Sequence, residues 1–498
     1  MGPKRERRWK AWVGLPGLAI AFIPAACTVG PDYVPPAAPV QAAYKELKGW
    51  KKATPSDGID RGAWWTVFKD PRLDDLASQV ELSNQTVAAS EAAYRQTLAV
   101  IKEAQAGLFP AVTGNYNVIG EHFGAQALGI SSSRAAGAIT TTIATLSANA
   151  TWDVDLWGKI RRTIESDVAS AQVSAADLAN AKLSAQALLA TAYYNLRGAD
   201  ALEALYHDTV VAYRRTLEIT QHQFEAGTVS KADVDTALSQ LLNTQALYIG
   251  VGVQRAQFEH SIAVLMGKTP AEVTIPHIPL GYRLPDIPVS VPSALLERRP
   301  DIAASERAVQ QENALIGAAI ALYYPDLSLT GMFGFAGTGA LALSIANEVW
   351  SISGSVVQTA FDAGLRDAQV EAAVATYKQS VATYRQTVLT AFQQVEDQLA
   401  AIRIYAREQK VADASVKAAK EEVDILLNQY RAGTVAFTAV VVAQAMLLAD
   451  QETALAVRQN RFLAAVSLIE ALGGGWNSAL LPSMRALATR NPLIPDLQ

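Results

Sequence analysis

Apolar and polar residues alternate along short stretches of this chain, which is the period-2 pattern of a β-strand with one apolar and one polar face. In residues 146–154 every second side chain is apolar, and the residues between them are Ser, Asn, Thr or Asp. Similar alternation predicts strands near residues 112–118, 327–335 and 350–356. We expect each strand to be about 9 to 11 residues long, which is enough to cross a bilayer at a tilt.

The spacing of apolar residues changes after Gly158 to steps of three and four, which places these side chains along one face of a helix. No Pro and only one Gly, Gly198, interrupt the stretch before Gly227. It therefore predicts a single helix of roughly 68 residues, about 100 Å long, that ends at a glycine suited to a left-handed cap. Residues 365–432 contain no Gly or Pro and predict a second helix of the same kind.

The chain repeats itself at a constant offset. The joint between strand and long helix recurs, and so does an Ala-Gly-Thr-Val turn after each long helix. Three pairs of glycines share the offset of 206 residues: Gly158 and Gly364, Gly227 and Gly433, and Gly267 and Gly473. One register kept by three landmarks indicates an internal duplication.

Four shorter helices are predicted between the strands and the turns. Their expected bounds are Leu73–Ala106, Lys231–Met266, Pro300–Tyr323 and Phe437–Leu472. Two of them placed end to end match one long helix in length. In the expected arrangement the second and third stack on each other, and the helix before the first strand continues the helix that ends the chain. A mobile loop at residues 120–138, an irregular Pro-rich insert at 270–292 and a disordered tail from Ala479 complete the plan.

This plan divides the chain into consecutive segments. They are a signal peptide (residues 1–26), an extended N-terminal lead (27–71), a helix (72–110), a first strand hairpin (111–157), a first long helical hairpin (158–269), an insert (270–299), a helix (300–325), a second strand hairpin (326–363), a second long helical hairpin (364–473) and a C-terminal tail (474–498).

The first 27 residues have the pattern of a bacterial secretion signal. Five basic residues precede an apolar run at residues 11–23 that is short for a membrane span, and Ala25-Ala26 precede Cys27, the only cysteine. This order is typical of a lipoprotein signal, in which Cys27 is acylated after cleavage. Pro24 departs from the usual pattern, because an aliphatic residue normally lies three positions before the cysteine.

Composition argues against several classes of function. The formal net charge of −5 gives no reason to expect nucleic acid as a partner. The five histidines are scattered without metal-ligand spacing, and the sequence has no clustered His, Cys or carboxylate constellation of a catalytic site. The glycines between the third and fourth strands fit a flexible loop better than a phosphate-binding loop. We therefore expect no enzyme, no cofactor and no bound metal.

Strands that are apolar on one face and polar on the other need lipid on one side and water on the other. A closed barrel with a wet lumen provides both, and it hides the strand edges. Four strands cannot close a barrel, because the smallest membrane barrels have about eight. We therefore expect the chain to oligomerise, with the long helices attached to the shared barrel.

Several short motifs are spread over nearly the whole mature chain. They are Cys27 followed by Val29-Gly30-Pro31-Asp32-Tyr33, Trp64-Trp65 with Phe68 and Asp70-Pro71, Leu295-Leu296-Glu297-Arg298-Arg299-Pro300-Asp301, Ala321-Leu322-Tyr323-Tyr324-Pro325 and the paired Ala-Gly-Thr turns. With these motifs the chain resembles the outer-membrane efflux protein family, the TolC-like channels, and in particular the lipoprotein branch that serves tripartite drug exporters.

The resemblance implies a fold class that mixes helices and strands. The fold would be a homotrimer with a 12-stranded transmembrane β-barrel, four strands from each chain, continued by a long α-helical barrel across the periplasm. The function implied is the exit channel of a tripartite efflux system in the bacterial outer membrane, passively conducting drugs or other small toxic molecules. Its partners would be outer-membrane lipid, a periplasmic adaptor (membrane fusion) protein and an inner-membrane RND-type pump, with a lipid anchor at Cys27.

The resemblance also gives roles to the two turns. They would form the periplasmic tip, where the adaptor docks and the channel closes at rest, with the contact residues Gly227, Thr228, Val229, Gly433, Thr434 and Val435. Asp233 matches an acidic tip position of the family, and Arg431, beside the second turn, is a candidate partner for an acidic neighbour at the same constriction. In the second half Val442 stands at the family's acidic position, nine residues past the turn glycine, and Ala439 lies six past it. This departure would weaken an acidic ring and its cation preference.

Two other functions are compatible with the same pattern. A type I secretion channel has the same fold and exports polypeptides, although Cys27 and the stretch Arg298–Asp301 favour drug efflux. A periplasm-spanning coiled coil without a pore would conduct no ions. The Ser, Thr and Asn faces of the strands argue against this second alternative.

Overall fold

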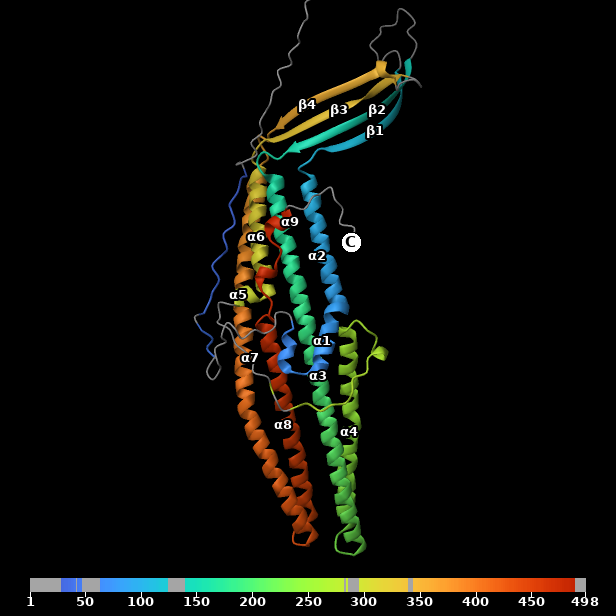
Figure 1. Cartoon of the computed structure of the whole chain (residues 1–498), viewed down its shortest axis with the longest axis vertical. Coiled ribbons are helices and arrows are strands. Elements are labelled where there is room, and N and C mark those ends of the chain that lie inside the picture. The colour runs from blue at the N-terminus through green and yellow to red at the C-terminus, as the bar shows by residue number, and fades with distance from the viewer. Residues whose placement is uncertain are drawn as a thin grey trace, which may run out of the picture.

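The computed structural model describes residues 28–41, 43–46, 63–123, 139–281, 284, 295–338 and 344–488. The predicted signal peptide and Cys27 lie outside these residues. The molecule is long and narrow, with a sheet at one end and helices that run away from it to two turns at the other end (Figure 1).

The elements follow the order predicted from the sequence. The strands are β1 (Ala111–Phe123), β2 (Ile139–Val154), β3 (Asp326–Thr338) and β4 (Glu348–Val357). The α-helices are α1 (Pro71–Ser83), α2 (Gln85–Ala106), α3 (Lys159–Glu225), α4 (Lys231–Leu265), α5 (Leu295–Arg298), α6 (Pro300–Ala321), α7 (Leu365–Arg431), α8 (Phe437–Ala471) and α9 (Met484–Ala488). Short 3₁₀ helices are η1 (Trp64–Phe68), η2 (Pro270–Glu272), η4 (Ile345–Asn347) and η5 (Ser478–Leu480).

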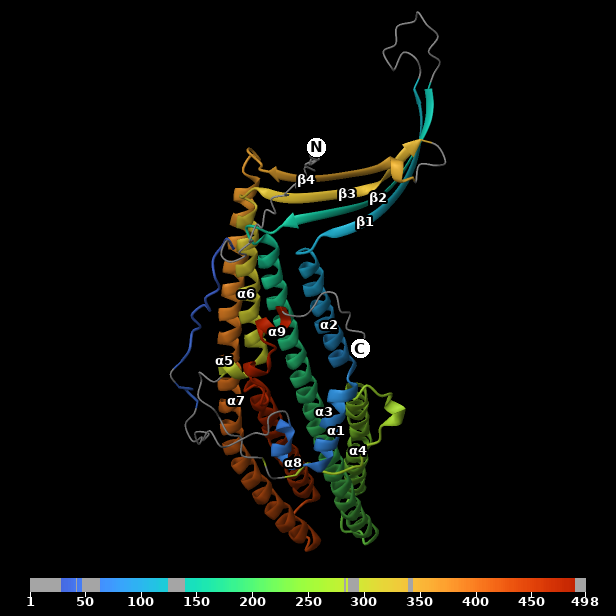
Figure 2. The ribbon, with the colours of Figure 1, turned by 45° about the horizontal axis from the view of Figure 1, so that its top comes forward.

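The four strands form one antiparallel sheet in the order β1-β2-β3-β4. Leu146 at the centre lies opposite Tyr116 of β1 and Phe335 of β3. Three strands are longer than expected, with 13, 16 and 13 residues in β1, β2 and β3. Within the described chain the outer edges of β1 and β4 have no strand partner, so the sheet is an open strip that needs other strands to close. It curves away from the helix ends (Figure 2).

The helices confirm the internal duplication. The long helices α3 and α7 each have 67 residues and begin 206 positions apart, at Lys159 and Leu365. The returning helices α4 and α8 each have 35 residues, and α2 and α6 each have 22. Each long helix is therefore about 100 Å of unbroken α-helix, as the absence of Pro predicted.

The single helix predicted over Leu73–Ala106 is wrong, because the chain breaks at Asn84 into α1 and α2. Asn84 has extended backbone angles, and its side chain accepts hydrogen bonds from the backbone N–H groups of Thr86 and Val87. This is the N-cap arrangement that starts a new helix. A short polar side chain that can cap a helix interrupted the pattern without any Pro or Gly.

The expected stacking of the short helices is also wrong. Asn84 Nδ2 donates to the carbonyl oxygen of Leu265 at 2.7 Å, so the end of α4 meets the start of α2. Arg299 Nη1 donates to the carbonyl oxygen of Ala471 at 2.9 Å, so the end of α8 meets the start of α6. Lengths alone could not distinguish the pairings, because all combinations have similar sums. In both views α4 lies below α2, and α8 below α6 (Figures 1 and 2).

The largest hydrophobic core lies midway along the helices. Trp64 is fully buried there and donates its indole N–H to Gln186 at 3.1 Å. Nearer the sheet, Leu487 of α9 is buried beside Ile101 and Ile164. The predicted disorder of the tail is therefore wrong as far as residue 488, because Leu487 packs into an apolar site contributed by distant residues.

Candidate functional site

The two turns farthest from the sheet share one backbone geometry. Gly227 and Gly433 have φ values of +73° and +71°, which confirms the predicted left-handed caps. In the first turn the Thr228 N–H and hydroxyl both donate to the carbonyl oxygen of Gln223, at 3.0 and 2.9 Å. Thr434 makes the same two bonds at the same distances in the second turn. The threonines therefore lock both turns.

Val229 and Val435 follow these turns and lie against one shared apolar cluster, the tip cluster. Its buried members are Val210, Tyr213, Leu217, Ala237, Leu241, Tyr430, Phe437 and Val440. The cluster takes side chains from α3, α4, α7 and α8, so it joins the two helical hairpins near their ends. The six turn residues named from the sequence thus lie at the ends of two hairpins that touch each other.

Asp233 has a local structural partner. Its carboxylate accepts hydrogen bonds from the Ser230 N–H at 3.0 Å and the Ser230 hydroxyl at 2.8 Å, which completes a capping box at the start of α4. The second hairpin has Ala436 and Ala439 at the corresponding positions, and α8 begins without a side-chain cap. The second hairpin therefore lacks both residues of this capping box, the serine at position 436 as well as the acidic residue at position 439.

Arg431 lies in the last turn of α7. In the described chain its guanidinium donates to the Asn428 side-chain oxygen at 3.1 Å, so its partner is a neutral amide in place of the predicted acidic neighbour. A cation near a helix C-terminus is favoured by the helix dipole.

The sequence analysis missed Tyr430 and the polar groups around it. Tyr430 is only 3% exposed; its ring lies 5.2 Å from that of Phe437, and its hydroxyl donates to Thr220 Oγ1 at 3.4 Å. Burial raises the pKa of the Tyr430 phenol above its ordinary value. One helical turn farther from the tip, Gln444 Nε2 donates to Thr216 Oγ1 at 3.1 Å. These bonds cross between α3 and the second hairpin.

The residues that follow Cys27 lie at the boundary between sheet and helices. The Val29 N–H donates to the Trp157 carbonyl oxygen at 3.1 Å, and Thr28 packs against Gly158 so closely that a Cβ there would overlap it. Arg162 is buried and donates to the Val29 carbonyl oxygen at 3.1 Å and to the Asp32 carboxylate at 3.2 Å. The motif after Cys27 is therefore docked where the strands begin.

The sheet carries apolar side chains on its exposed surface. In β4 the exposed residues Trp350, Ile352 and Val356 alternate with serines, as predicted, and Phe333 of β3 is paired with Trp350. Polar groups bond across strands, as in the 2.6 Å contact between Thr330 and Ser353 hydroxyls. This sheet has the two chemically different faces of a membrane-spanning strand set.

One described helix, α8, is long and apolar enough by composition to cross a membrane, with a mean hydropathy of 1.4 over its most apolar window, 28% of which is buried in the single chain. Its repeat mate α4 also exposes large apolar side chains, including Leu242, Ile249 and Val253. Exposed apolar stripes on packed helices suit contacts with neighbouring helices of other subunits.

One group of potential metal ligands lies among the described residues, formed by Asp200, Glu203 and His277. Both carboxylate oxygens of Asp200 are already bonded, to Arg255 Nε at 2.9 Å and Arg197 Nη1 at 2.9 Å. His277 bonds Glu203 at 2.9 Å. These bonds attach the segment after α4 to the helices. We therefore interpret the group as a structural ion-pair network.

Comparison with known proteins adds the family. The chain matches the outer membrane efflux protein family over residues 76–268 and 291–474. The outer membrane protein OprJ of Pseudomonas aeruginosa is 29% identical over 479 residues, covering 93% of this chain and 96% of that protein. The probable efflux pump outer membrane protein TtgC of Pseudomonas putida is 28% identical, covering 92% and 94%.

Solved structures agree in fold. The outer-membrane channel OprN superposes with a TM-score of 0.82 at 27% identity, covering 90% of this chain and all of that chain. The Campylobacter jejuni CmeC outer membrane channel gives a TM-score of 0.84 at 22% identity. The described sheet is therefore one chain's share of a trimeric barrel that continues into a helical barrel. This chain belongs to the outer membrane efflux protein family and is an outer-membrane efflux channel, not an enzyme.

Proposed function

We propose that this channel receives small toxic molecules from an inner-membrane RND-type pump through a periplasmic adaptor and conducts them passively to the exterior. The observation that carries the proposal is the arrangement of one chain: an amphipathic sheet at one end, two exposed turns at the other, and two unbroken 67-residue helices between them. Relatives are named for efflux of an antibiotic, toluene and cations. These names support small molecules, in preference to polypeptides, as cargo.

The cargo class is tested by deletion and complementation in the source bacterium. Loss of the chain is expected to sensitise cells to several small toxic compounds, and the plasmid-borne chain to restore resistance. Secretion of a polypeptide that stops in the deletion strain while resistance is unchanged would favour the type I alternative. A non-conducting coiled coil is tested in planar bilayers, in which the purified trimer is expected to pass ions.

The adaptor contact is proposed at the two turns. Gly227, Thr228, Val229 and their repeat mates Gly433, Thr434 and Val435 form exposed, rigid loops, which is the preorganised shape that favours docking. Thr228→Trp or Thr434→Trp is expected to reduce export while trimers persist. Thr376→Trp, far up α7, is the control for a bulky substitution. Normal export by both tip variants would contradict the contact.

The resting constriction is proposed at Asp233 and Arg431, which lie beside the tip cluster. Asp233→Ala and Arg431→Ala are expected to alter conductance or ion selectivity of the purified trimer in planar bilayers, because each changes the charge near the narrowest part of the helical barrel. Unchanged conductance and selectivity in both variants would assign these residues to helix capping alone.

A lipid anchor at Cys27 is proposed from the docking of the next residues. Thr28 and Val29 are held beside Trp157 and Gly158, where the helices give way to the strands, so an acyl chain on Cys27 would begin close to the membrane surface. Mass spectrometry of the mature N-terminus tests this. An unmodified Cys27 would remove the anchor and leave the rest of the proposal unchanged.

A further inference from the structure

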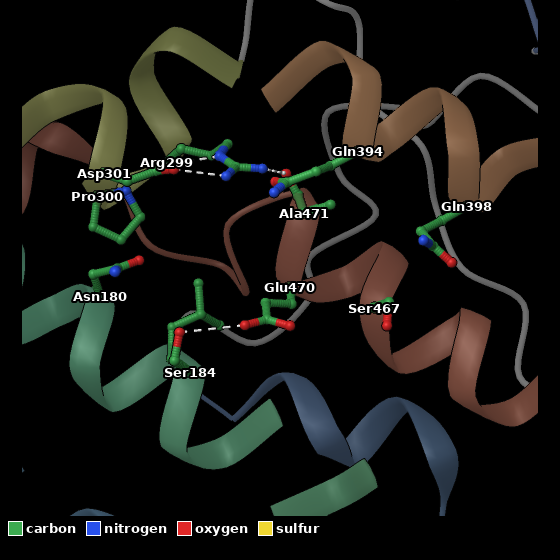
Figure 3. Close-up of a pocket in the computed structure, with 11 residues that line it drawn as sticks. Asn180, Ser184, Arg299, Pro300, Asp301, Gln394, Gln398, Ser467, Glu470 and Ala471 are labelled. Carbon is green, nitrogen blue, oxygen red and sulfur yellow. Dashed lines mark hydrogen bonds and ion pairs between the residues drawn. The ribbon is translucent and has the colours of Figure 1, made fainter. Parts of the chain in front are cut away.

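A polar cavity of about 390 Å³ lies where α8 ends and α6 begins, between α3 and α7 (Figure 3). We call it the junction cavity. Its polar lining consists of Asn180 and Ser184 from α3, Arg299 and Asp301 from the start of α6, Gln394 and Gln398 from α7, and Ser467 and Glu470 from α8. Its volume lies within the range of small-molecule sites.

The charged groups of the junction cavity divide into a paired set and an unpaired one. Arg299 donates to Asp301 at 3.0 and 2.6 Å and to the Ala471 carbonyl oxygen, so its charge is matched inside the fold. Glu470 accepts a hydrogen bond from Ser184 at 3.3 Å, and no basic side chain in the described chain is in ion-pair contact with it. Burial raises the pKa of the Glu470 carboxyl above its usual value. Glu470 is half-buried, and Arg299 offsets part of this pKa shift without forming an ion pair, so the negative charge of Glu470 is only partly compensated.

Neutral side chains around Glu470 also have unused hydrogen-bonding groups. In the described chain the amides of Asn180, Gln394 and Gln398 and the hydroxyl of Ser467 line the cavity and have no side-chain hydrogen-bond partner. In Figure 3 they surround the same hollow, and the dashed lines join only Ser184 to Glu470 and the groups around Arg299. Within the described chain these donors and acceptors have no protein partner, and because the four side chains are exposed or half-buried they are available to a ligand in the cavity.

The internal repeat shows that the helix junction does not need a carboxylate at the position of Glu470. The junction between α4 and α2 is closed by the equivalent bond, from Asn84 to Leu265. At the positions 206 residues before Glu470, Gln394 and Gln398, the chain has Val264, Leu188 and Ala192. The positions that match Asn180, Ser184 and Ser467 stay polar, as Gln386, Thr390 and Ser261, so the difference is confined to three positions. Stacking two helices end to end is thus achieved without a carboxylate at the position of Glu470, and this carboxylate calls for a different explanation.

Among the described residues, the cavity opens away from the segments attached to α3 and α7. Gln394 and Gln398 lie on one face of α7, and Glu396, which binds the N-terminal strap (residues 28–41 and 43–46), lies on the opposite face, 200° around the helix from Gln394. On α3, Ser184 is likewise opposite Gln186, which bonds Trp64. In a closed barrel the attached segments belong outside, because inside they would obstruct the passage. The junction cavity then faces the passage.

We propose that the junction cavity is a binding subsite for small organic cations. Glu470 pairs with a protonated amine of the ligand, and the surrounding amides and hydroxyls form hydrogen bonds with the other polar groups of the same ligand. This inference rests on the proposed function, because it treats the ligand as cargo in transit. Three copies in the trimer would give the passage wall three such subsites at one height. A subsite of this kind concentrates amine-bearing cargo without a conformational change.

The test uses the full-length trimer in detergent and spermidine as the probe, measured by isothermal titration calorimetry at neutral pH. Wild type is expected to bind spermidine saturably. Glu470→Gln keeps the size of the side chain and removes the charge, and it is expected to weaken binding at least tenfold. Asp397→Asn removes a carboxylate from an exposed position of α7 outside the cavity, and it is expected to bind as wild type does. Size-exclusion chromatography verifies that each variant is a trimer.

Equal spermidine affinity in wild type and Glu470→Gln, or the absence of saturable binding to wild type, would overturn the inference. Equal weakening by Asp397→Asn would do so as well, because it would indicate general charge attraction. Conductance of the same trimer without spermidine separates this inference from the proposed function. A conducting channel that binds no spermidine leaves the channel intact and removes only the subsite, whereas a trimer that passes no ions contradicts the channel itself.

Discussion

The two halves of the chain have matching long and returning helices and different side chains at several corresponding positions. Tyr430 of the second hairpin is buried between hairpins, whereas its repeat mate Phe224 is 44% exposed. Ser230 and Asp233 cap α4, whereas Ala436 and Ala439 leave α8 uncapped. The two halves therefore share their helices and turns, but the corresponding side chains make different contacts.

This difference teaches that the duplication kept the lengths of the long, returning and third helices equal, whereas the side-chain contacts diverged. The helix pairs of 67, 35 and 22 residues are equal in the two halves, as a repeated strip of wall requires. Symmetry ends at the tip cluster, where Tyr430 and Phe437 of the second hairpin insert toward α3. The second hairpin therefore contributes the aromatic pair of the tip cluster, which the first hairpin does not match, and the predictions below test the two halves against each other.

The largest difference is expected between Tyr430→Ala and Phe224→Ala. Emptying the buried Tyr430 site is expected to cost about 3 to 5 kcal/mol of local packing, as for other large aromatic truncations. We expect this loss to separate the hairpins and to raise the resting conductance. Phe224→Ala is expected to cost below about 1 kcal/mol, because exposed positions tolerate truncation. Planar-bilayer recordings and thermal unfolding of the trimer measure both, and equal effects would contradict the asymmetry.

A backbone prediction tests the parts that the halves share. Gly473 has a φ of +90°, and a Cβ there would overlap the Arg298 carbonyl oxygen; Gly267 approaches Ser83 in the same way. Gly473→Ala and Gly267→Ala are each expected to lower stability by roughly 2 to 4 kcal/mol, from the left-handed backbone and the overlap together.

Gly364→Ala is the matched control for these glycine variants. Gly364 has a φ of +87° but open space around its Cα, so only the backbone cost of about 1 to 2 kcal/mol remains. Thermal unfolding of the three variants compares them. A Gly473→Ala protein as stable as the Gly364→Ala protein would show that the helix junction can relax.

The sequence predicts features that depend on neighbouring residues, and it misses features that depend on contacts between residues far apart in the chain. Long helices are visible because Pro is absent, and the duplication because glycines are needed wherever the backbone is left-handed, as at Gly227. The break at Asn84 was missed because the polar cap lies in a stretch whose helical pattern continues on both sides. Stacking partners were missed because they depend on hydrogen bonds between residues about 180 positions apart, such as Asn84 and Leu265.

The candidate site was predictable to a similar extent. The tip turns were found because a Gly between Ala and Thr is a local signal. Tyr430 was missed because nothing in a single sequence distinguishes a buried aromatic residue from the exposed Phe224 in the repeated motif. Glu470 was missed because an isolated Glu in an apolar helix usually marks its solvated face. A comparison of the two repeats, in which Glu470 aligns with Val264, could have singled it out.

A smaller effect is expected from the helix caps. Ser230→Ala removes the capping box of α4 and is expected to cost about 1 kcal/mol. The double variant Ala436→Ser with Ala439→Asp builds the same box on α8, and we expect it to gain up to about 1 kcal/mol, since α8 starts with comparable backbone angles. Hydrogen exchange at the first turns of α4 and α8 reports each cap locally. If the double variant gains no protection from hydrogen exchange at the first turn of α8, the prediction that a capping box stabilises this helix is contradicted.

The smallest expected effect is the contribution of Glu470 to the pH dependence of stability. Because burial raises the pKa of this carboxyl in the folded protein, the folded state holds the proton more tightly than the unfolded state does. Stability is therefore expected to increase as pH falls from the folded-state pKa toward the lower unfolded-state pKa, and this contribution is lost as pH rises through the folded-state pKa. Glu470→Gln removes this dependence, so its thermal midpoint at neutral pH is expected to equal or slightly exceed that of wild type.

Val264→Gln, at the corresponding position of the other helix junction, has no charge to remove and is expected to leave the pH profile unchanged. A Glu470→Gln trimer that is clearly less stable at neutral pH would mean that the carboxylate is needed to join α8 to α6, and the contrast between the two junctions would then be structural in origin.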